Sequence, residues 1–273
     1  MTKHGKEVLL VIVLAAVASA ALFAAAVRGS ERGVFHTITD RGELRVGVSV
    51  FAPWVMRDGN GELAGFEIDV ARQLARDLGV GVSFVPAPWS DIIARLLAGR
   101  FDVIISGMSI TPEREKTVAF TRPYAETGYI LLASSARAKG RTLKDFDRPG
   151  VTIATRRGTT AAAAMRENFP KATLVYLNAG DVGYRRAAEG GVDAVSSTPA
   201  EAAIAIEKYG GALRVVSRKL LSPTREAFAV RKGDPEILDV LNTWIEEKRH
   251  SGWLKERHDY WFATRSWAKE TKP

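Results

Sequence analysis

The sequence contains no cysteine, and this absence narrows the chemistry that the protein can perform. It can form no disulfide, hold no zinc or iron–sulfur cluster through thiolates, use no thiol nucleophile and carry no lipid on a cysteine. Histidine is also scarce. Beyond the first few residues only His36, His250 and His258 remain; they lack metal-ligand spacing, and we expect them at the solvated surface. We therefore expect no metal and no cofactor.

Charge of one sign is not concentrated in any segment. The 273 residues include 39 Lys and Arg against 31 Asp and Glu, a formal net charge of +8. This excess is spread along the chain rather than gathered in basic runs, so nucleic-acid binding is not indicated. The chain also lacks a Walker-type phosphate loop, a Gly-x-Ser-x-Gly motif and a His-Glu-x-x-His motif. These absences argue against several large enzyme classes.

A long apolar run occurs at the N-terminus, where residues 8–27 contain Ser19 as their single polar member. Lys3 and Lys6 precede the run, and small residues surround Ser19. A basic start, an apolar stretch and small residues predict a secretory signal peptide in residues 1–27. The run is also long enough for a membrane anchor. We expect cleavage and export to the periplasm or another extracytoplasmic space, whereas an uncleaved helix would tether the protein to the inner membrane.

Short β-rich runs alternate with helical patterns along the rest of the chain. In residues 65–79, Phe66, Val70 and Leu74 recur every four residues, which predicts an amphipathic helix. The alternation forms two series, so we expect two α/β lobes, each a mostly parallel sheet flanked by helices. The expected strands are 44–50, 82–85, 101–105, 129–133, 151–154, 174–177, 192–195, 213–216 and 227–230. The expected helices are 65–79, 90–98, 181–189, 199–209, 235–250 and 254–263, with two more starting at 111 and 159.

Two loops that follow predicted strands have features of anion-binding sites. The first, residues 106–114, contains small and hydroxyl side chains and ends with Arg114 in the first turn of a predicted helix. A cation there opposes the helix dipole, and a carboxylate bound by the guanidinium would resolve that conflict. Pairing of Arg114 with a neighbouring glutamate is the alternative. The second loop, residues 155–160, places Gly158 before another helix, as in a backbone anion site. Together the loops predict a cleft for a small carboxylate.

Aromatic residues occur near the same strand ends. Phe51 and Trp54 follow the first predicted strand, and Trp89 lies in the next strand-to-helix loop. Large aromatic side chains in such loops commonly form the walls of a ligand pocket. The alternative, strongest for Trp54, is that they pack beneath the loops.

The segments GFEIDVARQLARDLG at 65–79 and SGMSITPEREKTVAFTRPY at 106–124 together resemble family 3 of the bacterial extracellular solute-binding proteins. The resemblance covers about residues 36–263. It implies a two-lobed type II periplasmic binding fold, joined by hinge strands, that closes on an amino acid and delivers it as a monomer to an ABC transporter permease. The implied domains are lobe 1 at 36–132 plus 224–263, lobe 2 at 133–223, and a C-terminal tail at 264–273.

The resemblance also implies a set of ligand-binding residues. Arg114 would bind the ligand α-carboxylate, while Ser109 and Gly107 would add hydroxyl and backbone contacts. Thr160 and the neighbouring Thr159 would reach the same carboxylate from lobe 2.

Other positions carry over from the family in the same way. Phe51 and Trp89 match the aromatic positions that enclose the ligand side chain. Glu67 and Asp69 belong to the family signature, but they fall on a predicted helix, and we interpret them as structural.

One position departs from the family pattern. Members usually place an acidic residue a few positions after the strand at 192–195, where it pairs with the ligand ammonium, whereas this chain has Thr198. A hydroxyl cannot neutralise a buried ammonium, so the sequence predicts a small carboxylate, an amino acid or a derivative, without naming it. Arg156 and Arg157 favour a second carboxylate or another anion, unless they face solvent.

A catalytic alternative exists on the same fold. The chain also resembles the periplasmic cyclohexadienyl (prephenate/arogenate) dehydratases, including an aromatic, Arg-bearing C-terminus at 260–267. In those enzymes a glutamate three residues beyond the acidic position acts as general acid, and Glu201 falls there. A solvated helical glutamate is the simpler interpretation, so we expect a binding protein rather than an enzyme. A membrane-tethered sensory module is a third alternative, although no signalling domain follows within the 273 residues.

Overall fold

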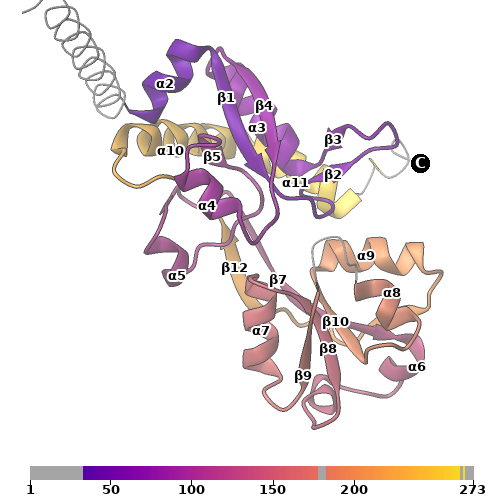
Figure 1. The fold of residues 1–273 in the computed structure, drawn as a ribbon. Coiled ribbons are helices and arrows are strands. Elements are labelled where there is room, and N and C mark those ends of the chain that lie inside the picture. Colours follow the sequence, from indigo (N-terminus) through magenta and orange to yellow (C-terminus); the bar gives the residue numbers. More distant parts are fainter. Residues whose placement is uncertain (1–32, 178–182, 265–266, 268–273) are drawn as a thin grey trace, which may run out of the picture.

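The computed structural model of the protein describes residues 33–177, 183–264 and 267. The predicted signal segment 1–27 lies outside these residues, as does most of the predicted tail. Figure 1 shows two α/β lobes connected by long strands. Within the described residues, no helix combines the length and apolar character needed to cross a membrane.

The first lobe is built on a five-stranded sheet of order β4-β1-β5-β13-β6. Its strands are β1 (Glu43–Val48), β4 (Gly81–Pro86), β5 (Val103–Ile104), β6 (Ala119–Phe120) and β13 (Ala229–Val230), and a hairpin is formed by β2 (Met56–Arg57) and β3 (Leu63–Ala64). Its helices are α2 (Val34–Arg41), α3 (Phe66–Asp77), α4 (Ile92–Leu97), α5 (Pro112–Glu115), α10 (Pro235–His250) and α11 (Trp253–His258), the last followed by a π-helical turn at Asp259–Thr264. Buried side chains between the sheet and these helices form the core of the lobe.

Helix α3 shows how the sequence determines the local fold. Phe66, Val70 and Leu74 are fully buried on one face, as the four-residue spacing predicts. Gly65 precedes the helix at a φ of 130°, and a Cβ there would lie 2.3 Å from the carbonyl oxygen of Trp54. Only glycine fits this approach, which holds the helix start against the aromatic loop after β1.

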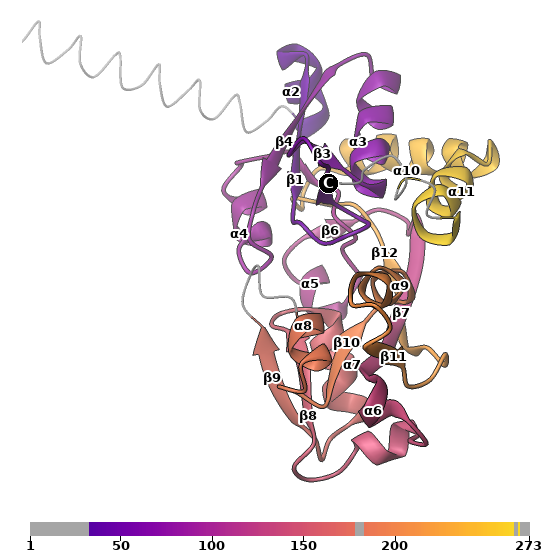
Figure 2. The ribbon, with the colours of Figure 1, turned by 90° about the vertical axis from the view of Figure 1, so that its right-hand side faces the viewer.

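The second lobe is built on the sheet β11-β7-β10-β8-β9, with β12 paired to β7. Its strands are β7 (Ala125–Ser134), β8 (Thr152–Arg156), β9 (Thr173–Leu177), β10 (Ala194–Ser197), β11 (Leu213–Val215) and β12 (Leu221–Glu226). Its helices are α6 (Ser135–Ala138), α7 (Thr160–Asn168), α8 (Gly183–Ala188) and α9 (Pro199–Lys208), with a 3-10 turn at Leu143–Phe146. Buried clusters pack on both faces of this sheet, so helices cover it on two sides (Figure 2).

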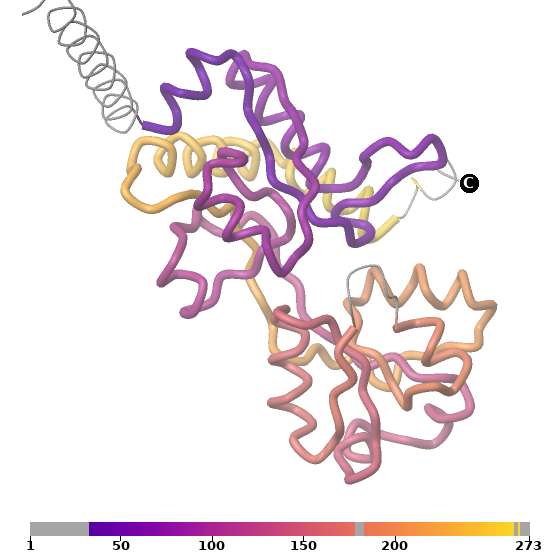
Figure 3. The backbone as a smooth tube through the Cα atoms, viewed as in Figure 1, coloured from indigo at the N-terminus to yellow at the C-terminus, as the bar shows by residue number. Residues whose placement is uncertain are grey.

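The chain crosses between the lobes along β7 and β12, which pair antiparallel (Figure 3). The predicted two-lobed α/β fold with hinge strands is therefore confirmed. The expectation of mostly parallel sheets is confirmed, because all strands of each sheet run in one direction except β13 in the first lobe and β7 in the second. The pairs β1–β4, β1–β5, β8–β9 and β8–β10 are parallel, whereas β7 and β13 pair antiparallel with their neighbours. Strand β7 carries the chain out of the first lobe, and β13 follows the returning strand β12.

Several local predictions need correction. Helix α4 is preceded by Asp91 as its N-cap rather than by Ser90, whose hydroxyl instead hydrogen-bonds the Asp91 carboxylate at 2.8 Å. Helix α2 and strand β12 were not predicted. Strand β12 contains Pro223 and a register shift between Leu221 and Thr224, and both features obscure the strand pattern.

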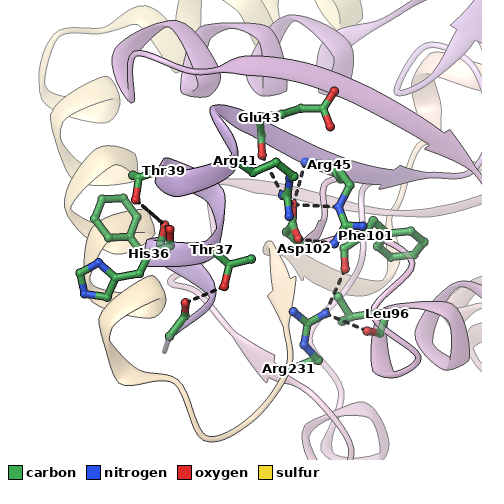
Figure 4. Close-up of polar contacts among 12 residues, drawn as sticks. His36, Thr37, Thr39, Arg41, Glu43, Arg45, Leu96, Phe101, Asp102 and Arg231 are labelled. Carbon is green, nitrogen blue, oxygen red and sulfur yellow. Dashed lines mark hydrogen bonds and ion pairs between the residues drawn. The ribbon is translucent and has the colours of Figure 1, made fainter. Parts of the chain in front are cut away.

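Asp102, in the segment before β5, connects α2 and β1 through hydrogen bonds and ion pairs (Figure 4). Its buried carboxylate accepts hydrogen bonds from the Arg45 backbone N–H at 2.8 Å and from the Arg45 guanidinium at 2.9 Å, and it also pairs with Arg41. Nearby, Arg231 donates to the carbonyl oxygens of Leu96 and Phe101, at 3.0 Å each. These contacts fix the outer end of the first sheet, away from the cavity described next.

Candidate ligand-binding site

A cavity of about 650 Å³ lies between the two lobes. Seven of the eight residues that we predicted from the sequence line it: Phe51, Trp89, Gly107, Ser109, Thr159, Thr160 and Thr198. The eighth, Arg114, is not a lining residue, but its guanidinium contacts two residues that are, Ser109 and Trp89. The two loops singled out in the sequence therefore meet at one place, although they are about fifty residues apart in the chain.

Aromatic rings form the first-lobe wall. Phe51 and Trp89 lie edge to face, with ring centroids 6.0 Å apart. Trp54 is only 2% exposed and packs against Phe66 and Phe262, as the alternative for this residue predicted, although it also contributes to the wall. A Cβ on Gly107 would lie 3.0–3.1 Å from Phe51 and Trp54, so glycine allows the loop to pass close to these rings.

Glu67 supports the Gly107 loop from within the first lobe. Its fully buried carboxylate accepts a 2.7 Å hydrogen bond from the Gly107 backbone N–H and another from the Tyr124 hydroxyl. Burial raises the pKa of Glu67 to about 8, although both hydrogen bonds act in the opposite direction. The Gly107 N–H that the family resemblance assigns to the ligand is thus occupied by Glu67 in this structure.

A chain of hydrogen bonds joins the lobes at the cavity. The Tyr129 hydroxyl contacts the Thr160 hydroxyl, which lies 3.1 Å from the Ser109 hydroxyl. Ser109 in turn donates to the Glu226 carboxylate at 3.2 Å, and Thr224 donates to the same oxygen at 2.7 Å. Ser109 and Thr224 reach this point from different segments, so the chain connects lobe 1, the hinge and lobe 2.

Glu226 is a cavity residue that sequence reasoning missed. It is 1% exposed, it lies at the end of β12, and its second carboxylate oxygen has no hydrogen-bond partner among the described residues. Burial raises the pKa of Glu226 to about 7. Tyr129 and Tyr184 line the cavity as well and were also missed. The segment before Glu226 did not look like a strand, so its position could not be inferred.

Arg114 follows Thr111, whose side chain accepts a 3.2 Å hydrogen bond from the Arg114 backbone N–H and caps α5. The guanidinium carbon lies 5.3 Å from the Trp89 ring centroid, over the ring. It donates to the carbonyl oxygen of Ser109 at 2.8 Å and to that of Gly158, in lobe 2, at 3.4 Å. Burial lowers the pKa of Arg114, against the raising effects of Tyr129 and Glu226, and no carboxylate of the described residues forms an ion pair with it.

The two arginines of the second loop, Arg156 and Arg157, lie in different environments. Arg156 is half-buried and lines the cavity. Arg157 is exposed and stacks over the Tyr176 ring, with 4.3 Å between the guanidinium carbon and the ring centroid. Arg156 is the last residue of β8, whereas Arg157 lies in the turn that follows, and only Arg156 reaches the cavity.

Thr198 caps helix α9, and its side chain is already engaged. It accepts a hydrogen bond from the Glu201 backbone N–H at 3.3 Å, and its hydroxyl donates to the Glu201 carboxylate at 3.0 Å. Glu201 is half-buried and lines the cavity, so the interpretation of a solvated helical glutamate is wrong. Burial raises the pKa of Glu201, against the opposing effects of Thr198 and Arg156.

The three histidines of the described residues are not among those that line the cavity. His36 and His250 are exposed, as predicted, but His258 is not. Its ring stacks on Phe262 at 4.4 Å and meets the edge of Phe66, and burial lowers its pKa. The prediction of a solvated His258 is therefore wrong, because the C-terminal turn folds back onto α3. The described residues hold no group of three or more His, Asp or Glu side chains that could bind a metal ion.

Comparisons with known proteins agree with this geometry. The chain is 28% identical over 234 residues to an L-cystine-binding protein of Escherichia coli K12, covering 85% of this chain and 87% of that protein. It is 27% identical over 252 residues to the cyclohexadienyl dehydratase of Pseudomonas aeruginosa, covering 92% and 94%. A solved structure of an ancestral amino acid-binding protein, a precursor of cyclohexadienyl dehydratase, superimposes with a TM-score of 0.77 at 36% identity, covering 84% and 99%.

The family of bacterial extracellular solute-binding proteins, family 3, matches residues 44–264, which include every strand of both sheets except the first residue of β1. The match spans both lobes and the hinge strands. The chain belongs to family 3 of the bacterial extracellular solute-binding proteins.

Proposed function

We propose that the protein binds a small carboxylate, an amino acid or a derivative of one, in the cavity between its lobes and delivers it to an ABC transporter permease. The observation that carries this proposal is the meeting of Ser109 and Thr160 from opposite lobes at 3.1 Å, beside the Arg114 guanidinium. Hydroxyls and a guanidinium at one point form an environment suited to a carboxylate. The relatives include proteins named for binding cystine and arginine, which supports an amino acid ligand.

Ligand capture would follow from the two-lobed arrangement. A ligand that contacts both lobes makes its full set of contacts only when they are closed, so it shifts the population towards the closed state. We propose that this closed, monomeric form is what the permease recognises. The lobes would comprise residues 36–132 plus 224–263 and residues 133–223.

A thermal-shift screen tests the proposal directly. Amino acids, dicarboxylates and opines are added to the purified protein, and hits are confirmed by calorimetry. A ligand that binds the folded state raises the melting temperature, and the rise grows with the logarithm of its concentration once this exceeds the dissociation constant. A panel in which no carboxylate stabilises the protein would contradict the proposal.

We also propose that the protein is exported to the periplasm. Residues 1–27 would direct export, with cleavage leaving a free periplasmic protein. Mass spectrometry of the protein purified from its own host distinguishes a cleaved chain from one retained at the membrane.

One observation supports a second candidate, a cyclohexadienyl dehydratase-like activity. Glu201 lines the cavity, and burial raises its pKa, which is what a general acid requires. A relative bearing that enzyme's name matches 92% of the chain. The test is phenylpyruvate formation from prephenate, with loss of turnover in Glu201→Gln. Absence of turnover by the unmodified protein would remove this candidate and leave the binding function in place.

A further inference from the structure

Arg156 presents an uncompensated positive charge to the cavity. It ends β8, it is half-buried, and within the described residues its guanidinium makes no hydrogen bond and no ion pair. Burial lowers the pKa of Arg156, which reflects the cost of removing this charge from water. A guanidinium carries N–H donors in a planar fork, and leaving them without acceptors in a partly dry site is unfavourable.

The nearest carboxylate does not serve as its partner. Glu201 raises the pKa of Arg156 through space, but the two groups form no ion pair within 4 Å. One Glu201 oxygen already accepts hydrogen bonds from the Thr198 backbone N–H at 3.1 Å and from its hydroxyl at 3.0 Å. Lys208, further along α9, adds a second cation to the same wall. The lobe 2 wall therefore carries two cations against one carboxylate whose pKa is raised.

The cavity has room for a ligand with two separated acidic groups. Its volume of about 650 Å³ lies within the range of pockets that hold drug-sized molecules. The Ser109, Thr160 and Arg114 cluster occupies the junction of the lobes, whereas Arg156 and Lys208 lie on the lobe 2 wall. An acidic group at each place would satisfy both sets of donors.

We propose that Arg156 binds a second carboxylate of the ligand, so that the protein selects dicarboxylates and amino acids with an acidic side chain or substituent over their neutral counterparts. The inference rests on the proposed function, since the first carboxylate occupies the junction of the lobes. Arg156 is then a specificity-determining residue, and Arg157 is not. A bidentate guanidinium–carboxylate pair supplies the discrimination, because a primary amide cannot accept both N–H donors with a full negative charge.

The experiment compares acids with their amides by calorimetry on the purified protein. The probes are L-aspartate, L-glutamate and L-2-aminoadipate against L-asparagine and L-glutamine, with glutarate and adipate against their monoamides. The unmodified protein is expected to bind at least one acid about 10- to 100-fold more tightly than its amide. Arg156→Gln is expected to abolish that preference, because it removes the positive charge that distinguishes the acid from its amide.

Arg157→Gln is the matched control, since it removes the adjacent charge outside the cavity and should keep the preference intact. A circular dichroism melt of both variants verifies that they fold. Equal binding of acid and amide by the unmodified protein, or an undiminished preference in Arg156→Gln, overturns the inference but leaves a carboxylate-binding protein. If no acid and no amide binds, the proposed function fails first, and the inference fails with it.

Discussion

The hydroxyl oxygens of Ser109 and Thr160 lie 3.1 Å apart, and this contact joins the two lobes inside the cavity. Its direction can be deduced. Ser109 donates its proton to the Glu226 carboxylate, so Thr160 must donate to Ser109 and Tyr129 to Thr160. With Glu226 ionised, every hydroxyl proton of the chain is already committed. A ligand carboxylate at this point must therefore compete with Glu226 for the hydrogen bond that the Ser109 hydroxyl donates.

This competition predicts a proton-linked affinity. When the Ser109 hydroxyl turns to the ligand, Glu226 loses a hydrogen bond and faces a second negative charge, so ligand binding favours protonated Glu226. The pKa of Glu226 is already raised to about 7, and affinity should therefore fall as pH rises above 7. For the carboxylate that binds most tightly in the screen, we expect the dissociation constant measured by calorimetry to be about tenfold higher at pH 8.5 than at pH 6.5.

Glu226→Gln is the matched variant, because glutamine keeps an oxygen acceptor for Ser109 and Thr224 but imitates the protonated acid. Its affinity should be nearly independent of pH between 6.5 and 8.5 and should exceed that of the unmodified protein at pH 8.5. A pH dependence that survives in Glu226→Gln would show that another group takes up the proton.

Arg114 is expected to contribute most of the carboxylate affinity. Its guanidinium is half-buried against Trp89, and among the described residues it donates to the carbonyl oxygens of Ser109 and Gly158 alone, so donors remain for a ligand. Arg114→Ala should weaken binding at least about 100-fold in calorimetry, and Arg114→Lys about tenfold, because an ammonium lacks the planar fork. Arg95→Ala, an exposed site on α4, is the control and should leave the affinity unchanged. Unaltered binding by Arg114→Ala would refute the assignment.

Glu67 is expected to make folding stability depend on pH. Its pKa of about 8 in the folded protein exceeds the unfolded value of 4.5, so the folded state binds more protons between these limits. The contribution of Glu67 to the free energy of unfolding is therefore largest below pH 4.5, and it declines as the pH rises towards 8. We expect Glu67 to contribute on the order of 3 kcal/mol across this range, after allowance for relaxation of the site.

Urea denaturation at pH 5, 6.5 and 8 measures this effect. Glu67→Gln keeps an acceptor for the Gly107 N–H and should flatten the profile, whereas Glu67→Ala should lower stability at every pH because it leaves that N–H unpaired. A steep decline retained in Glu67→Gln would assign the titration to a different carboxylate.

The regular elements were predictable from the sequence because periodicity reports burial. Helix α10 has the predicted bounds of 235–250, and α3 differs from its prediction by one or two residues at each end. Strand β12 was not predictable, since Pro223 and its alternating polar residues resemble a loop; its pairing with β7 comes from the hinge, which no local pattern encodes.

The candidate site was predictable only in part, for a related reason. The resemblance indicated Ser109 and Thr160 by motif, and the structure brings them together. It could not indicate Glu226, which contacts Ser109 from 117 positions away in the chain. Nor could the sequence choose between Arg156 and Arg157. Arg156 ends strand β8 and Arg157 begins the turn after it, and which of the two borders the cavity is decided by how the lobes pack.

Substitutions of Thr198 test how the protein accommodates a ligand ammonium without an acidic residue at this position. Its hydroxyl holds the Glu201 carboxylate, and it supplies no charge of its own to a ligand ammonium. Thr198→Asp keeps a good N-cap for α9 and adds a carboxylate at the position where the family resemblance implies one, so it should favour α-amino acids over the same acids without the amino group by about tenfold. Calorimetry with L-glutamate and glutarate measures the ratio. Thr198→Asn caps the helix without charge and should leave the ratio as in the unmodified protein. An equal ratio in all three proteins would show that Glu201 or Glu226 already neutralises the ammonium, and that the missing acid has been replaced from another element of the fold.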